Sequence, residues 1–253
     1  MIGIFDSGTG GLSVFREIRK VLPDQSYIYY SDIAHCPYGE KTREYIIGRA
    51  RAITEFLMEK GAEIIVVACN TATAAAITTL RKEYPVRFIG MEPAVKPAAA
   101  ATETGVVGVL ATAGTLRAEK YIDNRERFAY DVRIVEHVGQ GFVELVESGN
   151  TEGKEAEETV MESLKPLMDA GADTIVLGCT HYPFLEKTIR KVAEECAPER
   201  KVTIIDPAPA VARHLVEVMD EEGIGRCAAG GFSISLHTSG DINDLKLKYS
   251  RLI

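Results

Sequence analysis

The sequence predicts an α/β protein with two similar three-layer domains, each built on a mostly parallel sheet. Short runs rich in Ile and Val alternate with segments of helical period along the whole chain, which is typical of βα units around parallel sheets. A stretch of the first half also recurs in the second half, so we expect two halves related by a pseudo-two-fold axis. Because the chain is 46% hydrophobic and 26% charged, disordered and fibrous classes are excluded.

The strands are expected where short apolar runs are bounded by turn residues. Each run is too short for a helix and is rich in β-branched residues. The predicted strands are Ile2–Phe5, Ser26–Tyr30, Ile64–Ala68, Arg87–Gly90, Gly105–Leu110, Val132–Glu136, Thr174–Gly178 and Val202–Ile205.

Three segments between these runs carry apolar residues at spacings of three and four, which predicts amphipathic helices. They are Ile46–Leu57, Ala156–Leu167 and Leu185–Cys196. Gly61 follows the first as a helix stop. Pro166 should bend or interrupt the second, because proline lacks an N–H and its ring clashes with the preceding turn.

The repeat covers residues 59–70, which can be laid on residues 169–180 without a gap. Gly61 then pairs with Gly171, and Cys69 pairs with Cys179. Matching strand ends in two such halves would face each other across an interdomain cleft, where ligand sites of α/β proteins usually lie. The repeat therefore directs attention to the residues that follow the two matching strands.

Charge and hydropathy narrow the class of partner. With 29 Lys and Arg against 37 Asp and Glu, the net charge is −8, which disfavours nucleic acid and anionic membranes as partners. No apolar run approaches the roughly 18 residues that a membrane-spanning helix needs. The first residues also lack the pattern of a signal peptide. We therefore expect a cytoplasmic protein that acts on a small molecule.

The thiols of Cys69 and Cys179 are the first candidates for chemistry. Five widely spaced cysteines without an export signal make a disulfide framework improbable. Cys69 and Cys179 each end a predicted strand before a helical segment, where helix N–H groups favour a thiolate. A single cysteine at such a place is more often a small core residue. Two cysteines at matching places of a repeat favour a chemical role.

The segment from Asp6 to Gly11 follows the first predicted strand and is rich in glycine. A dinucleotide fingerprint that starts at Gly8 fails at its sixth place, which is Ser13, and no phosphate-loop motif is present. Backbone N–H groups here could still approach a carboxylate, while Asp6 could bind an ammonium group or assist a thiol. Turn formation and helix capping by Asp6 and Ser7 are the alternative.

His181 lies two residues after Cys179 and could relay protons at neutral pH. A zinc site made of Cys69, Cys179 and His181 matches no four-ligand spacing. Glu147 fits a surface helix as well as a functional role. The polar turn from Asp32 to Tyr38 is expected at the mouth of the cleft. Of the other cysteines, Cys36 is expected to be local structure, Cys196 a core residue, and Cys227 has no chemical context.

These residues closely resemble the glutamate racemases of the aspartate/glutamate racemase family. The resemblance runs over nearly the whole chain, with small departures at Ala111 and His237, where many members have Gly and Tyr. The matching motifs are Asp6-Ser7-Gly8-Thr9-Gly10-Gly11-Leu12-Ser13-Val14, Pro37-Tyr38-Gly39, Ala68-Cys69-Asn70-Thr71-Ala72, Gly114-Thr115, Gly178-Cys179-Thr180-His181-Tyr182-Pro183 and Thr238-Ser239-Gly240.

The resemblance implies a domain formed by residues 1–94 and 209–253, with residues 95–208 inserted as the second domain. It implies that Cys69 and Cys179 are the acid/base groups, assisted by Asp6, His181 and Glu147. It further implies a homodimer that needs neither cofactor nor metal and supplies D-glutamate for peptidoglycan. The residues implied to bind substrate are Asp6, Ser7, Tyr38, Gly39, Asn70, Thr71, Thr112, Thr115, Thr180 and His181.

Three alternatives remain open at this point. A racemase of aspartate or another amino acid differs only in pocket shape, which the sequence does not display. A two-domain solute-binding protein would also have a cleft between similar halves, although it needs no paired thiols. A redox enzyme would require Cys69 and Cys179 to form a disulfide in the active protein.

Overall fold

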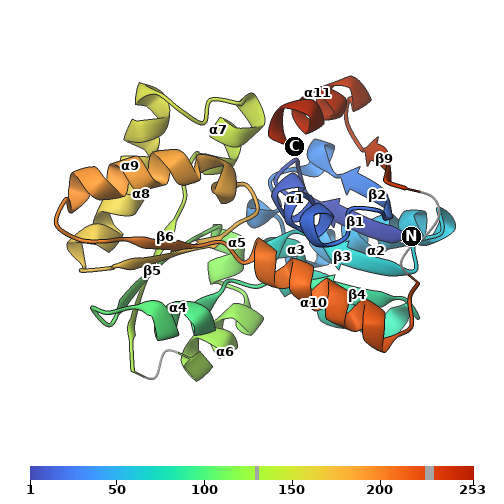
Figure 1. Ribbon diagram of the computed structural model, residues 1–253, viewed down its shortest axis with the longest axis horizontal. Coiled ribbons are helices and arrows are strands. Elements are labelled where there is room, and N and C mark those ends of the chain that lie inside the picture. Colours follow the sequence, from blue (N-terminus) through green and yellow to red (C-terminus); the bar gives the residue numbers. More distant parts are fainter. Residues whose placement is uncertain (129–130, 226–230) are drawn as a thin grey trace. The chain divides into compact units, whose positions relative to one another are not determined.

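The computed structural model describes residues 1–128, 131–225 and 231–253, and Cys227 lies outside them. The chain divides into two compact units. The first unit comprises Met1–Met91 and Ala208–Ile253, and the second comprises Glu92–Pro207. Each unit is a parallel sheet with helices packed on it (Figure 1). The predicted α/β class with parallel sheets is thus confirmed. None of the described helices is long and apolar enough to cross a membrane.

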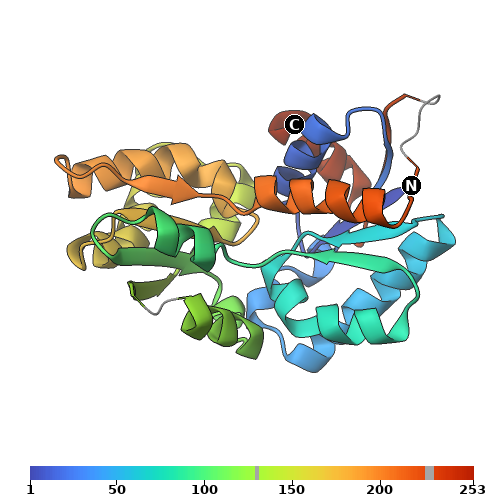
Figure 2. The same cartoon turned by 60° about the horizontal axis from the view of Figure 1, so that its bottom comes forward.

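The first unit has a five-stranded sheet in the order β4-β3-β1-β2-β9, and every described pairing is parallel. Helices α2 and α3 contribute to one apolar cluster with the sheet. Helix α10 packs beside α1 (Figure 2), and Phe15 of α1 meets Tyr27 of β2 edge to face at 5.2 Å. The elements are β1 (Ile2–Asp6), α1 (Leu12–Val21), β2 (Ser26–Ser31), η1 (Ile33–His35), η2 (Tyr38–Glu40), α2 (Arg43–Glu59), β3 (Ile64–Val67), α3 (Asn70–Glu83), β4 (Arg87–Gly90), α10 (Ala208–Glu221), β9 (Ser233–Thr238) and α11 (Ile242–Leu252).

The second unit has a four-stranded parallel sheet in the order β6-β5-β7-β8. Helices α7, α8 and α9 cover one face of this sheet, and α4 and α6 cover the other (Figure 1), so it is a three-layer unit. The elements are α4 (Val95–Ala101), β5 (Val106–Ala111), α5 (Ala113–Leu116), α6 (Glu119–Phe128), β6 (Arg133–Val138), α7 (Phe142–Ser148), α8 (Lys154–Asp169), β7 (Thr174–Gly178), η3 (Tyr182–Leu185), α9 (Glu186–Cys196) and β8 (Thr203–Ile205).

Every strand that the apolar runs predict is present, with ends that differ by no more than a residue or two. Strand β9 is not among the predicted strands; it is a partly exposed edge strand that pairs only with β2 in the described sheet. Of the expected bend or interruption at Pro166, the interruption was wrong, because α8 runs through this residue to Asp169. Pro166 lacks only the N–H that would donate to the carbonyl of Glu162, and its own carbonyl still accepts the N–H of Ala170 at the end of the helix.

The repeat extends to the way two helices end. Gly61 after α2 and Gly171 after α8 have φ values of +90° and +97°. The N–H groups of Ala62 and Ala172 donate to the carbonyls of Leu57 and Leu167 at 3.0 and 3.1 Å. Each end is therefore a Schellman motif with glycine in the left-handed region. These motifs send β3 and β7 back into their sheets, and each strand leads to a cysteine.

Replacing Gly178 by alanine should lower the free energy of unfolding by ~1–3 kcal/mol through overpacking. The new Cβ would lie 2.7 Å from Cβ of Ala111 and 3.0 Å from the carbonyl oxygen of Leu110. Gly48→Ala in α2 is the matched control, because no described atom beyond its own helix backbone and chain neighbours lies within 4 Å. The control should be stabilised by ~0.5–1 kcal/mol. Urea unfolding measures both variants, and equal stability of Gly178→Ala and the wild type would contradict the packing argument.

Candidate active site

In the first unit, the thiol of Cys69 lies beside the end of β1. Strands β1 and β3 are parallel neighbours with Phe5 opposite Val67, so the residues after each strand reach the same edge of the sheet. Cys69 is the N-terminal cap of α3, and its Sγ accepts the N–H of Ala72 at 3.4 Å. The thiol donates to Oγ of Ser7 at 3.7 Å. The helix start and a neighbouring hydroxyl thus hold Cys69 in place.

Asp6 is fully buried at the end of β1. Its Oδ1 accepts the backbone N–H of Gly8 at 2.8 Å and the hydroxyl of Ser7 at 3.2 Å. A Cβ on Gly11 would lie 2.7 Å from Cβ of Asp6, so glycine is needed there for α1 to begin so close to the carboxylate. The turn chemistry considered for Asp6 is present, and it places the carboxylate at the same sheet edge as Cys69.

Asn70 opens α3 directly after the thiol and is only 3% exposed. Neither its amide nitrogen nor its amide oxygen has a hydrogen-bond partner within residues 1–128, 131–225 and 231–253. Leaving buried polar groups unpaired costs about 1–3 kcal/mol each, and such groups in native structures call for an explanation. Thr71 beside it is also buried. A polar ligand at the start of α3 would supply the partners that the Asn70 amide lacks.

Tyr38 and Gly39 form a buried single turn, η2, in the same unit. The phenol of Tyr38 donates to Oδ2 of Asp32 at 2.5 Å. Tyr38 shares an apolar cluster with Cys69 and Ala72, so this turn packs around the start of α3. Asp32 has no predicted role of its own, although a carboxylate just after a predicted strand is a signal in the sequence that points to it.

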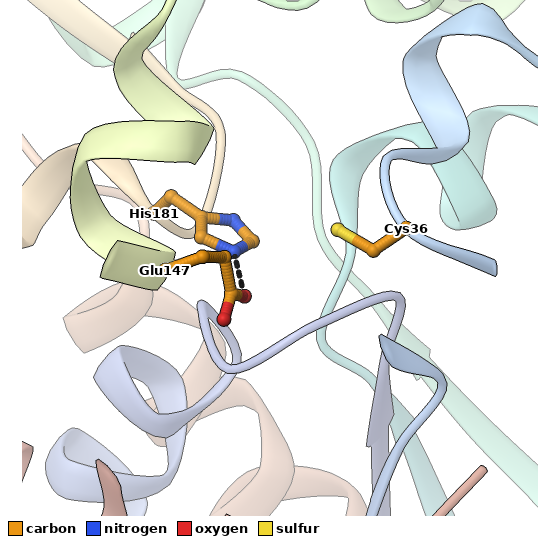
Figure 3. A group of neighbouring side chains, drawn as sticks. All are labelled: Cys36, Glu147 and His181. Carbon is orange, nitrogen blue, oxygen red and sulfur yellow. Dashed lines mark hydrogen bonds and ion pairs between the residues drawn. The ribbon is translucent and has the colours of Figure 1, made fainter. Parts of the chain in front are cut away.

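In the second unit, Cys179 begins a chain of three polar side chains. Its Sγ lies 3.8 Å from Nδ1 of His181. Nε2 of His181 lies 2.8 Å from Oε1 of Glu147, which comes from α7 (Figure 3). Burial lowers the pKa of His181, but the hydrogen bonds and charges of Cys179 and Glu147 outweigh it and hold this pKa well above 6.5. The three side chains can therefore hold a proton next to the thiol.

Hydroxyl groups surround the same end of the second sheet. Strand β5 pairs with β7 so that Ala111 faces Gly178, and Thr112 therefore follows β5 where Cys179 follows β7. Thr112 caps α5 by accepting the N–H of Thr115 at 3.3 Å, and the two hydroxyls lie 3.0 Å apart. Thr180 is buried. These three threonines offer hydrogen bonds near the thiol.

Of the other described cysteines, Cys196 lies in different surroundings. Cys36 and Cys196 are half-buried thiols. Sγ of Cys196 lies 3.4 Å from Sδ of Met161, and burial raises the pKa of this thiol. Cys196 packs against the core of the second unit, which agrees with the prediction of a core residue. The contact of Cys196 with the sulfur of Met161 is a packing contact and indicates no chemical role.

A groove of about 360 Å³ on the first unit has no part in this site. Residues at the start of β4, among them Arg87, and residues of α10, among them His214, line it. Arg87 is paired with Ile64 at the start of β3, whereas Cys69 follows the end of β3. The groove therefore lies at the amino edge of the sheet, and ligand sites of parallel α/β sheets lie at the carboxyl edge.

The two units together define an α/β protein with a thiol at the carboxyl end of a matching strand in each unit, among side chains suited to proton transfer. The model of the Asp/Glu/Hydantoin racemase family matches residues 2–215, and the chain belongs to this family. The resemblance seen in the motifs is thereby confirmed.

Relatives with assigned names agree with this family. The chain is 49% identical over 241 residues to a glutamate racemase of Stutzerimonas stutzeri, which covers 95% of this chain and 89% of that protein. It is 44% identical over 240 residues to one of Herpetosiphon aurantiacus, which covers 95% and 92%. The Escherichia coli glutamate racemase in complex with L-glutamate and the activator UDP-MurNAc-Ala has a TM-score of 0.87 at 33% identity, with 99% and 94% of the two chains covered.

Proposed function

We propose that the protein is a cofactor-independent glutamate racemase in which Cys69 and Cys179 alternate as general base and general acid. The observation that carries the proposal is the repetition of one thiol at the end of matching strands in both units, each joined to a polar neighbour, Ser7 or His181. Racemisation needs two such groups, because a proton leaves one face of the α-carbon and another arrives on the opposite face. Relatives at 44–49% identity named glutamate racemases support the choice of substrate.

The reaction follows from the acidity of the groups. The α-proton of an amino acid is a very weak acid, so its removal requires a positioned base and donors that neutralise the substrate carboxylate. The thiolate of one cysteine takes the α-proton, and the electron pair of the C–H bond remains on the carbon. The thiol of the other cysteine then gives its proton to the opposite face. The two thiols have exchanged protonation states, and the reverse reaction uses them in the opposite roles.

The buried polar side chains are assigned to orient glutamate. The unpartnered amide of Asn70, together with Thr71 and Thr180, would hold the α-carboxylate and the amino group. Asp6 would bind the ammonium group or assist Cys69. The other residues proposed to bind substrate are Ser7, Tyr38, Gly39, Thr112, Thr115 and His181.

His181 and Glu147 are assigned to Cys179. A protonated imidazole 3.8 Å from Sγ can donate a hydrogen bond to the sulfur of this cysteine. Glu147 in turn stabilises the imidazolium from its other side. The polar neighbours of Cys69 include Ser7 and the N–H of Ala72. They differ in kind from the His181–Glu147 pair beside Cys179.

Incubation with L-glutamate in D₂O without added cofactor tests the function. We expect the circular dichroism of glutamate to decay to zero while deuterium appears at Cα in the nuclear magnetic resonance spectrum. The Cys196→Ala variant is the control, because this thiol packs against Met161 and the core, and it should behave like the wild type. If folded protein produces neither signal, the proposal is wrong.

A panel of amino acids tests the substrate. We expect glutamate to be racemised faster than aspartate, since the relatives at 44–49% identity are named glutamate racemases. Solved structures of aspartate racemase type match at 19–22% identity and support only the shared fold. Product D-glutamate would serve peptidoglycan synthesis in the cytoplasm, and we propose a homodimer, which sedimentation of the purified protein checks. Faster turnover of aspartate would overturn the substrate assignment.

A further inference from the structure

A buried carboxylate of the first unit ties the proposed substrate turn to a helix. Asp32 follows β2 and is 0% exposed. Arg49 of α2 donates two parallel hydrogen bonds to this carboxylate, from Nε to Oδ2 at 2.9 Å and from Nη2 to Oδ1 at 2.8 Å. The phenol of Tyr38 donates to the same Oδ2 at 2.5 Å. Asp32 thus connects β2, α2 and the turn that carries Tyr38 and Gly39.

The charges of this group are well defined. Burial raises the pKa of Asp32, but hydrogen bonds from Arg49, Tyr38 and Ser239 outweigh it and hold the pKa below 3.8. Burial and the neighbouring Asp32 raise the pKa of Tyr38 far above 10.0. At neutral pH the carboxylate is therefore charged, and the phenol keeps the proton that it donates.

Residues Thr238–Gly240, at the end of β9 and just after it, also contact the turn that begins at Asp32. Oγ of Ser239 accepts the N–H of Ala34 at 3.1 Å, and the N–H of Ser239 donates to the carbonyl of Ser31 at 3.1 Å. A Cβ on Gly240 would collide with the side chain of Ile33. The Thr238-Ser239-Gly240 motif, which has no place in the proposed chemistry, therefore packs on the turn that Asp32 begins.

Stability alone is a weak explanation for this arrangement. Burying a charged pair costs desolvation that its attraction often only balances. The chain offers a direct comparison on the same helix, where Arg51 makes two bonds of 2.8 and 2.6 Å to Glu83 in an exposed position. The Asp32–Arg49 pair differs from the Arg51–Glu83 pair in being joined to Tyr38, which packs in one cluster with Cys69.

We propose that Asp32 and Arg49 are positioning residues that, with Ser239, hold Tyr38 and Gly39 against the Cys69 half of the substrate site. This inference rests on the proposed function for its effect on glutamate. It assigns the carboxylate and guanidinium no contact with the substrate. Their influence reaches the substrate through the phenol of Tyr38 and the turn that follows it.

The test compares Asp32→Asn with Glu83→Gln, which removes the charge of the matched exposed pair. We expect Asp32→Asn to raise KM for L-glutamate about tenfold, the value of one hydrogen bond to a charged group, with a smaller change in kcat. Glu83→Gln should leave both constants unchanged. In a Tyr38→Phe background, Asp32→Asn should add little further loss, because its route to the substrate is already cut. Arg49→Lys should retain more affinity than Arg49→Met.

The outcomes separate the inference from the proposed function. Equal KM values for Asp32→Asn, Glu83→Gln and the wild type would overturn the inference while the racemase activity stands. A wild type without activity would overturn the function, and the inference is then decided by alkylation of Cys69 with iodoacetamide, followed by mass spectrometry. Asp32→Asn should speed this alkylation severalfold and Glu83→Gln should not, and equal rates would overturn it. If Asp32→Asn fails to fold, Ser239→Ala and Arg49→Met serve in the same assays.

Discussion

Replacing Cys69 by alanine should lower kcat/KM for glutamate racemisation by about 10³-fold, within the range for loss of a general acid or base. Cys179→Ala should have an effect of similar size, because each thiol is proposed to serve one face of the α-carbon. A cysteine-to-alanine change removes one sulfur atom, whereas the groups proposed to bind substrate are hydroxyls, amides and backbone N–H groups. The dissociation constant of L-glutamate, measured by calorimetry, should therefore change little.

Isotope exchange sharpens this prediction. A variant with one thiol can still remove and return a proton on a single face. Each variant should then exchange the α-proton of one enantiomer in D₂O without inverting it, and the two variants should prefer opposite enantiomers. Cys196→Ala controls for the loss of a thiol in general. Full racemase activity in either Cys69→Ala or Cys179→Ala would refute the role of that residue.

Glu147→Gln should produce the second largest loss, with kcat/KM reduced about 10–100-fold, as expected for a charge-assisted hydrogen bond worth about 1.5–3 kcal/mol. Glu147 is one of the groups that hold the pKa of His181 well above 6.5. Without its charge this pKa falls, so the imidazolium beside Cys179 loses its proton at lower pH. The alkaline limb of the kcat/KM profile should therefore move to lower pH.

The raised pKa of His181 also predicts how the free energy of unfolding of Glu147→Gln depends on pH. A histidine whose pKa is raised in the folded state stabilises the fold fully below the unfolded value of 6.5, and this contribution disappears as the pH rises through the folded value. The deficit of Glu147→Gln in free energy of unfolding should thus be largest at mildly acidic pH and shrink at alkaline pH. Glu144→Gln, an exposed change one turn earlier in α7, is the control. An unshifted alkaline limb in Glu147→Gln would contradict the assignment.

The parts of the fold that the sequence predicts are those set by local pattern. Strands β3 and β7 are continuous buried runs, each preceded by a helix that ends at a glycine in a Schellman motif, and both the apolar run and the glycine can be read along the chain. Strand β9 could not be predicted in this way, because its Ser-Ile-Ser-Leu-His-Thr sequence is partly exposed at an edge. Its place depends on pairing with β2, which is distant in sequence.

Some features of the candidate site can likewise be predicted from local sequence, and others cannot. That Asp6 and Cys69 meet at one sheet edge follows from parallel pairing of β1 and β3. The bond of His181 to Glu147 was carried only by the family resemblance, since spacing allowed a surface position for Glu147 equally well. The Asp32–Arg49 pair depends on how α2 is rotated against the sheet, and no local pattern specifies that rotation. The catalytic roles themselves stay predictions until the variants are measured.

The unlike neighbours of the two thiols have a thermodynamic consequence. L- and D-glutamate are mirror images with equal free energies, so their equilibrium constant is unity and the Haldane relation makes kcat/KM equal in both directions. Ser7 beside Cys69 and the His181–Glu147 pair beside Cys179 can therefore alter the ratio of the two kcat values only together with the ratio of the two KM values. Any substitution near one thiol that raises kcat for one enantiomer relative to the other must raise its KM relative to the other by the same factor.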